Sequence, residues 1–417
     1  MTLVPLRKNR DFVLLQVGQT LSTIGSEATG LAYPLLVLAV TGSPAQAGVV
    51  GFARIVPWAL FGFVAGVVAD RMNRKRVMIV SDIVRIVAVL SLVLTLALHR
   101  VSVAQIAIVA FIEGAMFVFF NIAELGALRS VVPGRQLPAA AAAEQARYST
   151  VTLVAPPLGG ALFGLGRTLP FVADVVSYLF SLGSLLLMRT PFQEEREEDE
   201  LPARAQLAEG FRWLWGHRFF RACALLFSWL NLVFEGLFLV LIVVGRRQGL
   251  SGGQIGLLIA AFGVASLLGS IAAPRVIRLL SMRALVLGSF WINLGFVAFL
   301  LKPSVYVLVA SSLPMALFSP IANSAVIGYR TAVVPDRLTG RVGGVARTIA
   351  LCTMAFGPLS AGLLLHWLSP RETVGCYAAL VLLLCVLGTW NPSIRNAPSL
   401  RDLDDLPTRT TSPAAAG

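Results

Sequence analysis

The chain has 417 residues, of which 57% are hydrophobic and only 13% are charged. Soluble proteins carry about twice that share of charged residues, and a soluble chain of this length would divide into about two or three domains with polar surfaces. The composition therefore excludes an ordinary water-soluble enzyme and indicates an integral membrane protein.

Apolar segments of membrane-spanning length recur almost to the C-terminus. They are about twenty residues long, twice the length of a barrel strand, and a helix satisfies its own backbone hydrogen bonds within lipid. We therefore predict an all-α integral membrane protein with twelve transmembrane helices. The predicted spans are residues 12–40, 46–69, 76–98, 102–125, 138–165, 168–188, 218–245, 253–279, 284–301, 304–328, 341–367 and 372–390.

The basic residues indicate how these spans are oriented. The net charge is +13, and 31 of the 34 basic residues are arginine. Of the basic residues, 24 fall on the side of the two termini, six on the opposite side and four within spans. The positive-inside rule then predicts a multi-pass protein with both termini in the cytoplasm. The arginine-rich and alanine-rich composition is typical of a high-GC genome, so we expect a bacterial inner membrane.

The same distribution argues against a nucleic-acid partner. The basic residues lie between apolar segments, and they form no basic stripe interleaved with aromatic residues. The four cysteines and three histidines are scattered, without the spacing of a metal site. We therefore expect no metal and no nucleic acid, and the lipid bilayer itself is a partner.

The chain divides into two related halves. We predict a six-helix bundle over residues 1–188, a cytoplasmic linker over 189–217, a second six-helix bundle over 218–390 and a disordered cytoplasmic tail over 391–417. At a fixed offset of 202 residues, Asn121 matches Asn323, Gly126 matches Gly328, Pro133 matches Pro335, Pro156 matches Pro358 and Gly160 matches Gly362. This internal repeat predicts two pseudo-symmetric bundles in parallel orientation.

The loop after the second span carries a motif, which reads GVVADRMNRKR from Gly66 to Arg76. It resembles the loop signature G-x-x-x-D-x-x-G-R-R/K of the major facilitator superfamily, with Asn73 in place of the second glycine. Asparagine and glycine both tolerate a positive φ in a tight turn. The resemblance implies a gating loop that links the two halves in the outward-open state, formed by Gly66, Asp70, Arg71, Arg74, Lys75 and Arg76. Alternatively, the basic residues of the loop only set the topology.

Other segments are similar to the drug:proton antiporter branch of this superfamily, which includes macrolide-efflux proteins and the enterobactin exporter. They are Arg10-Asp11-Phe12, Ser81-Asp82-x-x-Arg85, the Pro-Phe-x-x-Asp of Pro170 to Asp174, and Gly249-Leu250-Ser251 before the eighth span. The resemblance covers the chain to about residue 392. It implies the major facilitator fold and a monomer.

The fifth span carries Ala155-Pro156-x-x-Gly159-Gly160, which resembles the antiporter motif G-P-x-x-G-G with alanine in the first position. Proline frees a backbone carbonyl and kinks a helix, and paired glycines let a neighbouring helix approach closely. We expect Pro156, Gly159 and Gly160 to form a helix-bending point for alternating access. The alternative is that they serve helix packing only.

Ionisable groups within the spans are candidates for proton coupling or substrate binding, because a charge in mid-bilayer is costly unless it is paired, hydrated or neutralised. Glu27, Glu113 and Glu235 lie near the middle of the first, fourth and seventh spans. In the family these spans line a central cavity, so the resemblance implies that all three carboxylates face it. The candidate counter-charges are Arg54, Arg147 and Arg347, and the alternative is a set of buried ion pairs. We expect structural roles for Asp82, Arg85, Glu124, Glu144 and Asp174.

The resemblance and the membrane carboxylates together predict a proton-coupled exporter of amphipathic small molecules, such as antibiotics or other secondary metabolites. It would work by alternating access, with the proton gradient as energy source and no cofactor. One alternative is a symporter or facilitator that takes up a small nutrient. The other is a membrane-embedded enzyme or receptor, which the lack of a phosphate-binding loop, a nucleophile elbow and a histidine cluster argues against.

Overall fold

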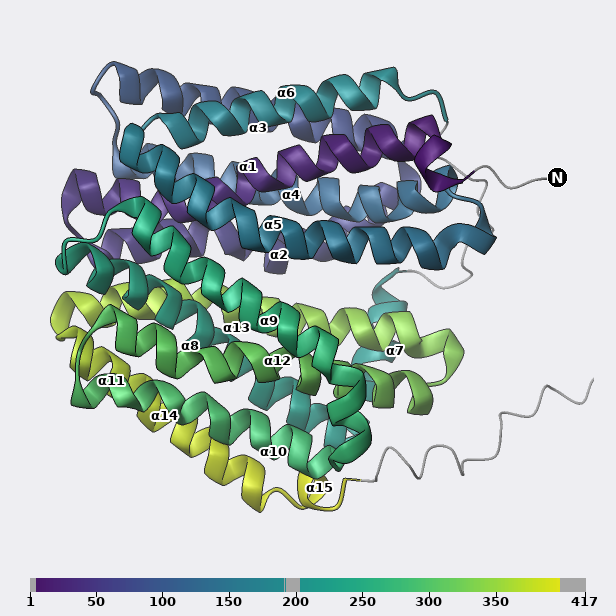
Figure 1. Cartoon of the computed structure of the whole chain (residues 1–417). Helices are drawn as coiled ribbons and strands as arrows, with labels where there is room; N and C mark the ends of the chain where they lie inside the picture. Colours follow the sequence, from purple (N-terminus) through teal and green to yellow (C-terminus); the bar gives the residue numbers. More distant parts are fainter. Residues whose placement is uncertain (1–4, 191, 193–202, 398–417) are drawn as a thin grey trace, which may run out of the picture.

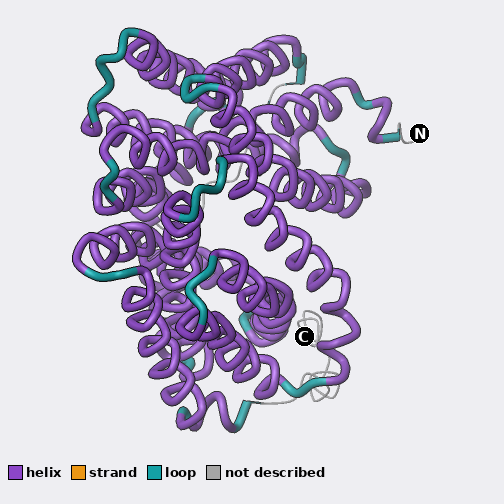
Figure 2. The backbone as a smooth tube through the Cα atoms, turned by 60° about the vertical axis from the view of Figure 1, so that its left-hand side comes forward, coloured by secondary structure: helices purple, strands orange, loops and turns teal. Residues whose placement is uncertain are grey.

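The computed structural model describes residues 5–190, 192 and 203–397, and this part of the chain is almost entirely helical (Figures 1 and 2). Twelve of its helices are long and apolar enough to cross a membrane. They form two bundles, which lie one above the other in Figure 1. The predicted all-α fold of twelve spans in two six-helix bundles is confirmed.

The N-terminal bundle contains the first six spans. Its elements are η1 (Leu6–Lys8), α1 (Arg10–Thr41), α2 (Pro44–Arg71), α3 (Arg74–Ala97), α4 (Val103–Val131), η2 (Gly134–Gln136), α5 (Leu137–Leu165) and α6 (Leu169–Leu187). Within it α1 packs on α5 and α6, and α4 packs on α2 and α3. Asp11 joins the start of α1 to the chain after α6, because its Oδ2 accepts hydrogen bonds from the backbone N–H groups of Arg189 and Thr190.

The C-terminal bundle contains the other six spans. Its elements are α8 (Arg218–Arg247), α9 (Gly252–Leu279), α10 (Met282–Asn293), η3 (Leu294–Val297), α11 (Ala298–Leu301), α12 (Val305–Val333), α13 (Asp336–Trp367), α14 (Pro370–Trp390) and α15 (Pro392–Arg395). The ninth span, predicted as one helix, is divided into α10, η3 and α11. Here α8 packs on α13 and α14, and α12 packs on α9 and α10.

Side-chain caps explain where many of the helices begin. An N-cap hydroxyl or amide oxygen satisfies a backbone N–H that has no partner within the helix. Asn9, Ser43, Asn73, Ser102, Ser251, Ser281 and Ser369 cap helices in this way. Asn73 has a φ of −60°, so it caps α3 and does not use the positive φ that its place in the loop motif suggested.

The predicted linker contains a further helix, α7 (Ala203–Gly216), which packs on α13. Glu209 of α7 forms ion pairs with Arg337, at 3.3 Å, and with Arg341, at 2.5 Å. The predicted tail is not disordered from its start, because α15 follows α14 directly and Ile394 is fully buried against the C-terminal bundle. Residues 398–417 of the predicted tail lie outside the described residues.

The first described residues, α7 and α15 all lie at the right-hand end of the bundles in Figure 1. We call this end of the molecule the terminal side, and the opposite end the distal side. The bundles contact each other mainly through two helix pairs, α2 with α13 and α5 with α9, and through a smaller contact of α1 with α8. These helices hold the central cavity described next.

Candidate functional site

A cavity of about 810 Å³ lies between the two bundles. Its walls come mainly from α1, α2, α4 and α5 of one bundle and from α8, α9, α12 and α13 of the other. This volume is in the range of pockets that hold drug-sized molecules. The six residues predicted for coupling or substrate binding all border the cavity: Glu27, Arg54, Glu113, Arg147, Glu235 and Arg347.

The bundles meet closely on the distal side through glycine. A side chain on Gly160 of α5 would overlap the carbonyl oxygen of Gly252 in α9. In the other helix pair, a side chain on Gly362 of α13 would overlap the backbone of α2 around Pro44 and Gly48. Gly160 and Gly362 are partners in the internal repeat, so both bundles contribute an equivalent glycine to the distal contact.

The predicted helix-bending motif takes part in this packing. α5 is continuous through Pro156, Gly159 and Gly160. A side chain on Gly159 would overlap the backbone of Ala28 in α1, within the same bundle, while Gly160 faces the other bundle. The motif therefore brings α5 close to two neighbours at once, and bending at Pro156 stays a prediction.

Toward the terminal side the two bundles move apart. Gly263 of α9 still lies beside Thr152 of α5, where an added methyl group would be 3.4 Å from the Thr152 carbonyl oxygen. Tyr148, one turn nearer the terminal side, is 67% exposed although it borders the cavity. The cavity is thus closed on the distal side by the glycine contacts and open toward the terminal side.

Two of the predicted carboxylates face the open part of the cavity. Glu27 of α1 is exposed there, and Glu235 of α8 is half-buried opposite it. Each lies within electrostatic range of the other and of Arg54. Gly357 of α13 helps to place Glu235, because a side chain there would collide with the Glu235 Cβ. One carboxylate from each bundle and one guanidinium therefore border the same cavity.

The other two predicted cations have different partners. Nη2 of Arg147 forms ion pairs with Glu124, at 3.0 Å, and Glu144, at 2.6 Å, and its Nη1 donates to the Thr23 hydroxyl. Arg147 is therefore committed to two carboxylates for which structural roles were expected. Arg347 of α13 lies over the ring of Trp58 in α2, 5.1 Å from its centroid. This cation–π contact spans the two bundles.

Glu113 of α4 is buried at the edge of the cavity, with only 2% of its surface exposed. Its Oε2 accepts a hydrogen bond of 2.7 Å from the Tyr33 hydroxyl, and its Oε1 lies 3.5 Å from the Thr29 hydroxyl. Thr29 also contacts Asp174 of α6, at 3.3 Å from Oδ2. Asp174 is fully buried and does not border the cavity. Two carboxyl groups from different helices thus share one threonine.

Arg85 of α3 is the most enclosed cation of the described chain, with 1% of its surface exposed. Its Nη2 donates to Asp82 at 2.7 Å, and its guanidinium lies between the rings of Phe120 and Tyr178, about 4.5 Å from each centroid. The Ser181 hydroxyl donates to the other oxygen of Asp82. The Arg85 Nε is buried without a hydrogen-bond partner among the described residues, but a buried charge needs a close counter-charge, and Asp82 supplies it. The environment of this pair therefore agrees with the expected structural role.

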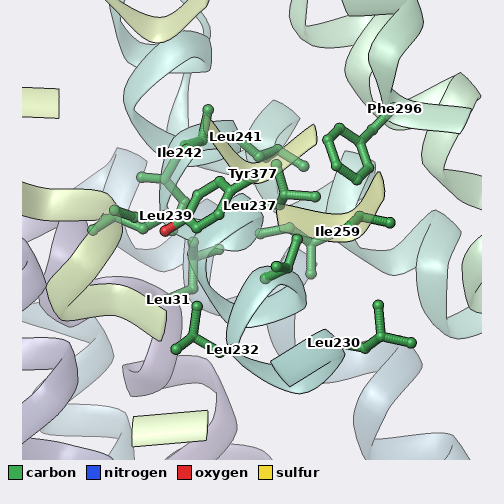
Figure 3. Close-up of a cluster of buried hydrophobic side chains, with 14 of the residues drawn as sticks. Leu31, Leu230, Leu232, Leu237, Leu239, Leu241, Ile242, Ile259, Phe296 and Tyr377 are labelled. Carbon is green, nitrogen blue, oxygen red and sulfur yellow. The ribbon is translucent and has the colours of Figure 1, made fainter. Parts of the chain in front are cut away.

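The C-terminal wall of the cavity is largely apolar. Phe227, Leu230, Phe234, Leu237, Phe238 and Leu241 of α8 line it at helical spacing, together with Ile259 and Phe262 of α9. Figure 3 shows part of this wall, where α8 side chains pack beside Ile259, Phe296 and Tyr377 of their own bundle and Leu31 of the other. Asn231, Asn293 and Ser312 are among its few polar members. A bulky apolar group can therefore be held against α8.

The predicted gating loop joins α2 to α3 on the terminal side. Arg74 donates to the carbonyl oxygens of Gly126 and Phe192, and Lys75 donates to the carbonyl oxygen of Met188. Gly126 leaves no room for a side chain beside the Arg74 guanidinium. The Arg74–Asp70 pair is long, at 4.0 Å. In this conformation Arg74 and Lys75 bind the ends of α4 and α6 within their own bundle, and the link between halves stays a prediction.

Four residues at the site were not among its predicted members: Asp174, Tyr33, Thr29 and Tyr178. A pattern in the sequence could have found them. On α6 the small or acidic side chains Asp174, Ser177, Ser181 and Ser184 recur at helical spacing, and Ser22, Ser26 and Thr29 do the same on α1. Such polar stripes in membrane helices mark helix contacts. The two stripes face each other, since the Thr29 hydroxyl lies 3.3 Å from Oδ2 of Asp174.

A two-bundle membrane fold with a large central cavity open to one side is that of a solute transporter. The chain matches the Major Facilitator Superfamily over residues 15–282, and it belongs to this family. It is a multi-pass protein of a bacterial membrane.

Named relatives agree with this assignment. The chain is 25% identical to the multidrug efflux pump Tap of Mycolicibacterium fortuitum, over 93% of this chain and 97% of that protein. It is 27% identical to macrolide efflux protein A of Streptococcus pyogenes, over 43% of this chain and 45% of that protein. The family resemblance seen in the loop motif is confirmed.

A solved structure shares the fold at low sequence identity. It is a bacterial homologue of the human lysosomal transporter Spinster, in an inward-facing and unoccupied conformation. The TM-score is 0.72 at 16% identity, over 91% of this chain and 96% of that one.

Proposed function

We propose that the protein is a proton-coupled exporter of amphipathic small molecules. The observation that carries this proposal is the cavity, which combines an apolar wall on α8 and α9 with four carboxylates: Glu27, Glu113, Glu235 and the Arg147-bound Glu124. An amphipathic solute presents an apolar body and a polar or cationic group, and the cavity offers a surface for each. The names of the relatives, a multidrug efflux pump and a macrolide efflux protein, support export.

The terminal side is assigned to the cytoplasm. The 24 to 6 distribution of basic residues between the two sides supports this orientation. Both termini and α7 then lie in the cytoplasm, and the cavity in this conformation opens inward. A solute enters the cavity from the cytoplasm, and it leaves after the distal contacts separate and the bundles close on the terminal side. The proton gradient supplies the energy, no cofactor takes part, and the unit is a monomer.

The carboxylates provide the coupling. A carboxylate that loses its water favours its neutral form, and a nearby guanidinium favours its charged form. A carboxyl group at the cavity therefore binds a proton in one conformation and releases it in the other when its surroundings change. Glu113 suits this role because it borders the cavity and is nevertheless almost fully buried.

Inverted membrane vesicles provide the test, because their outer surface is the cytoplasmic face. Vesicles from cells that express the protein, or carry an empty vector, are energised to acidify the lumen. A lipophilic cationic dye or a macrolide is then added, and a pH-sensitive fluorophore reports protons leaving the lumen. We expect solute-dependent proton release with the wild type, none with the vector and none with Glu113→Gln.

Glu209→Gln is the matched control, because Glu209 is a carboxylate on α7 outside the cavity. This variant should release protons as the wild type does. Proton movement in the same direction as the solute would instead show uptake by symport. A panel of solutes that gives no response above the vector would contradict export of amphipathic compounds.

A further inference from the structure

A group of carboxyl and hydroxyl side chains lies behind the cavity wall. Glu113 lies at the wall, Thr29 lies behind it, and Asp174 lies deeper still, between α1 and α6. The chain of contacts from the cavity to Asp174 passes through one hydroxyl group. Among the described hydrogen bonds of the Asp174 carboxyl, only the one with Thr29 leads on to Glu113 and the cavity.

Glu113 and Asp174 have too few hydrogen-bond donors around them for both carboxyl groups to be ionised. A hydroxyl donates one hydrogen bond, and an ionised carboxylate only accepts. The Thr29 hydroxyl lies 2.9 Å from the Ser26 carbonyl oxygen, closer than the 3.3 Å to Asp174 and the 3.5 Å to Glu113. The Ser177 hydroxyl lies 2.7 Å from the backbone carbonyl of Asp174 but 3.3 Å from its carboxyl.

Both hydroxyls thus have a nearer acceptor in the backbone of their own helix. When they donate to it, an ionised Asp174 has no donor left among the described residues. A protonated Asp174 resolves this shortage, because its O–H donates to the free lone pair of the Thr29 oxygen. Glu113 keeps the Tyr33 hydroxyl as its donor in either case.

The surrounding charges do not remove the need for a proton. The groups that face the two carboxyls are Tyr33 and Thr29 from α1, Arg54 from α2, Arg85 from α3 and Tyr178 from α6. Arg85 is bound to Asp82 at 2.7 Å, and Arg54 donates to the Ser26 carbonyl oxygen at 2.6 Å. In the described part of the chain, neither guanidinium forms an ion pair within 4.0 Å of Glu113 or Asp174. If Glu113 and Asp174 were both ionised, two negative charges would be buried without a cation in direct contact.

We propose that Glu113 and Asp174 hold one proton between them through Thr29, and that this buried proton drives transport. The inference rests on the proposed function and divides its carboxylates by role. Asp174 and Glu113 bind the proton, while Glu27 and Glu235 face the solute. In the transfer, the Thr29 hydroxyl first turns its hydrogen from the Ser26 carbonyl oxygen to Oε1 of Glu113. The Asp174 O–H bond then breaks as its proton passes to the Thr29 oxygen, and the Thr29 hydrogen passes to Oε1 of Glu113. Glu113 then exchanges the proton with water in the cavity.

Infrared spectroscopy tests the shared proton without any transport. Purified full-length protein in lipid nanodiscs at neutral pH should show the C=O stretching band of a protonated carboxyl group. Asp174→Asn should lose that band, because the remaining Glu113 keeps the Tyr33 hydroxyl as its donor and stays ionised. Glu113→Gln should keep a band but shift it, because Asp174 still lacks a donor while its proton no longer has a second carboxyl to pass to. Glu27→Gln, a carboxylate of the open cavity, should keep it. Absence of the band from the wild type, or an unchanged band in Asp174→Asn, would overturn the proposal.

Transport in proteoliposomes tests whether the proton is the driving one. We expect Asp174→Asn to lose proton-driven accumulation of the cationic dye but to keep dye exchange between equal concentrations, which also shows that the variant is folded. Thr29→Val should slow accumulation, and Thr29→Ser, which keeps the hydroxyl, should restore it. Full proton-driven accumulation in Asp174→Asn would contradict the assignment of the driving proton to Glu113 and Asp174. A wild type that moves no solute would contradict the proposed function, and the infrared band would still decide the shared proton.

Discussion

The N-terminal bundle keeps ionisable side chains in its interior, whereas the C-terminal bundle buries apolar side chains with few exceptions. Of the described residues, the buried charged ones all belong to the first bundle: Asp11, Asp82, Arg85, Glu113, Glu124 and Asp174. The buried polar residues of the second bundle are Ser228, Ser289, Ser312 and Thr373. Two bundles with one fold and a common repeat have therefore specialised.

The difference follows from what each bundle contains. Hydrogen bonds and ion pairs have direction, so the network around Arg85 and Thr29 holds α1, α3, α4 and α6 in one arrangement. Apolar contacts depend little on orientation. The apolar wall that α8 and its neighbours form should therefore tolerate exchange of one apolar side chain for another of similar volume. On the proposed function, the first bundle holds the proton and the second holds the varied apolar groups of the solutes.

The largest expected effect comes from breaking the buried ion pair of the first bundle. Asp82→Asn leaves the Arg85 guanidinium buried without its counter-charge, which should lower the free energy of unfolding by about 3–5 kcal/mol. Thermal unfolding of the purified protein in detergent measures this. The double variant Asp82→Asn/Arg85→Gln removes both charges and should recover part of the loss. If Asp82→Asn were as stable as the wild type, the buried ion pair would not distinguish the first bundle from the second.

The glycine contacts should show that the bundles are alike where they meet. Gly160→Ala and Gly362→Ala each introduce a methyl group that overlaps the opposite bundle, and overpacking of this kind costs about 1–3 kcal/mol. Both variants should therefore shift the protein away from the distally closed conformation and slow transport to a similar degree. Labelling of a cysteine introduced on the distal side of the cavity reports the shift.

The same helices contain the controls. Gly164 in α5 and Gly344 in α13 have open space where a methyl group would lie. Gly164→Ala and Gly344→Ala gain the same helix propensity without the overlap, so they should label and transport like the wild type. Unequal effects of Gly160→Ala and Gly362→Ala would mean that the bundles differ at their contact as well as in their interiors.

A smaller effect is expected at the carboxylates that face the cavity, one from each bundle. A carboxylate in contact with water contributes on the order of 0.5–1 kcal/mol to an ion pair. Glu27→Gln and Glu235→Gln should therefore each raise the KM for a cationic dye by about two- to fivefold, with an unchanged maximal rate. The measurement is concentration-dependent dye uptake into inverted vesicles. An uncharged solute serves as the control. An equal change in its KM would contradict a direct ion pair between these carboxylates and the cationic dye.

The smallest effect is expected at the ion pairs that hold α7 on the second bundle. Glu209 pairs with Arg341 and with Arg337, whose side chain is 75% exposed. Exposed pairs contribute about 0.2–1 kcal/mol, so Glu209→Gln should change the unfolding temperature little. Compared with Asp82→Asn under the same conditions, this variant measures the difference between the two bundles directly. A larger loss in Glu209→Gln would reverse the comparison.

Much of the fold could be predicted from the sequence because lipid imposes simple rules. Spans must be long and apolar, and their ends coincide with caps such as Ser251 and Ser369. The break in the ninth span could not be predicted in this way. η3 interrupts it where Gly295 packs closely on the carbonyl oxygen of Ser311 in α12, and that contact depends on the neighbouring helix.

The site could be predicted only in part, for a similar reason. The cost of burying charge identified Glu113 and placed it at the right depth. Depth along a helix does not say which way a side chain points, so Arg147 was expected to face the coupling carboxylates and instead binds Glu124 and Glu144. Asp174 was expected to be structural because it lies near the end of its span, and its neighbours Thr29 and Glu113 come from helices distant in sequence.

The apolar wall of α8 gives the protein a way to change over evolutionary time. Exchange of one large apolar side chain for another of similar volume costs less than about 1.5 kcal/mol, so Phe234, Leu237 or Phe238 can be replaced without loss of the fold. Each replacement reshapes the surface that an apolar group contacts. On the proposed function, substitutions in the second bundle can adapt the protein to a new compound, while the proton-binding residues of the first bundle stay unchanged.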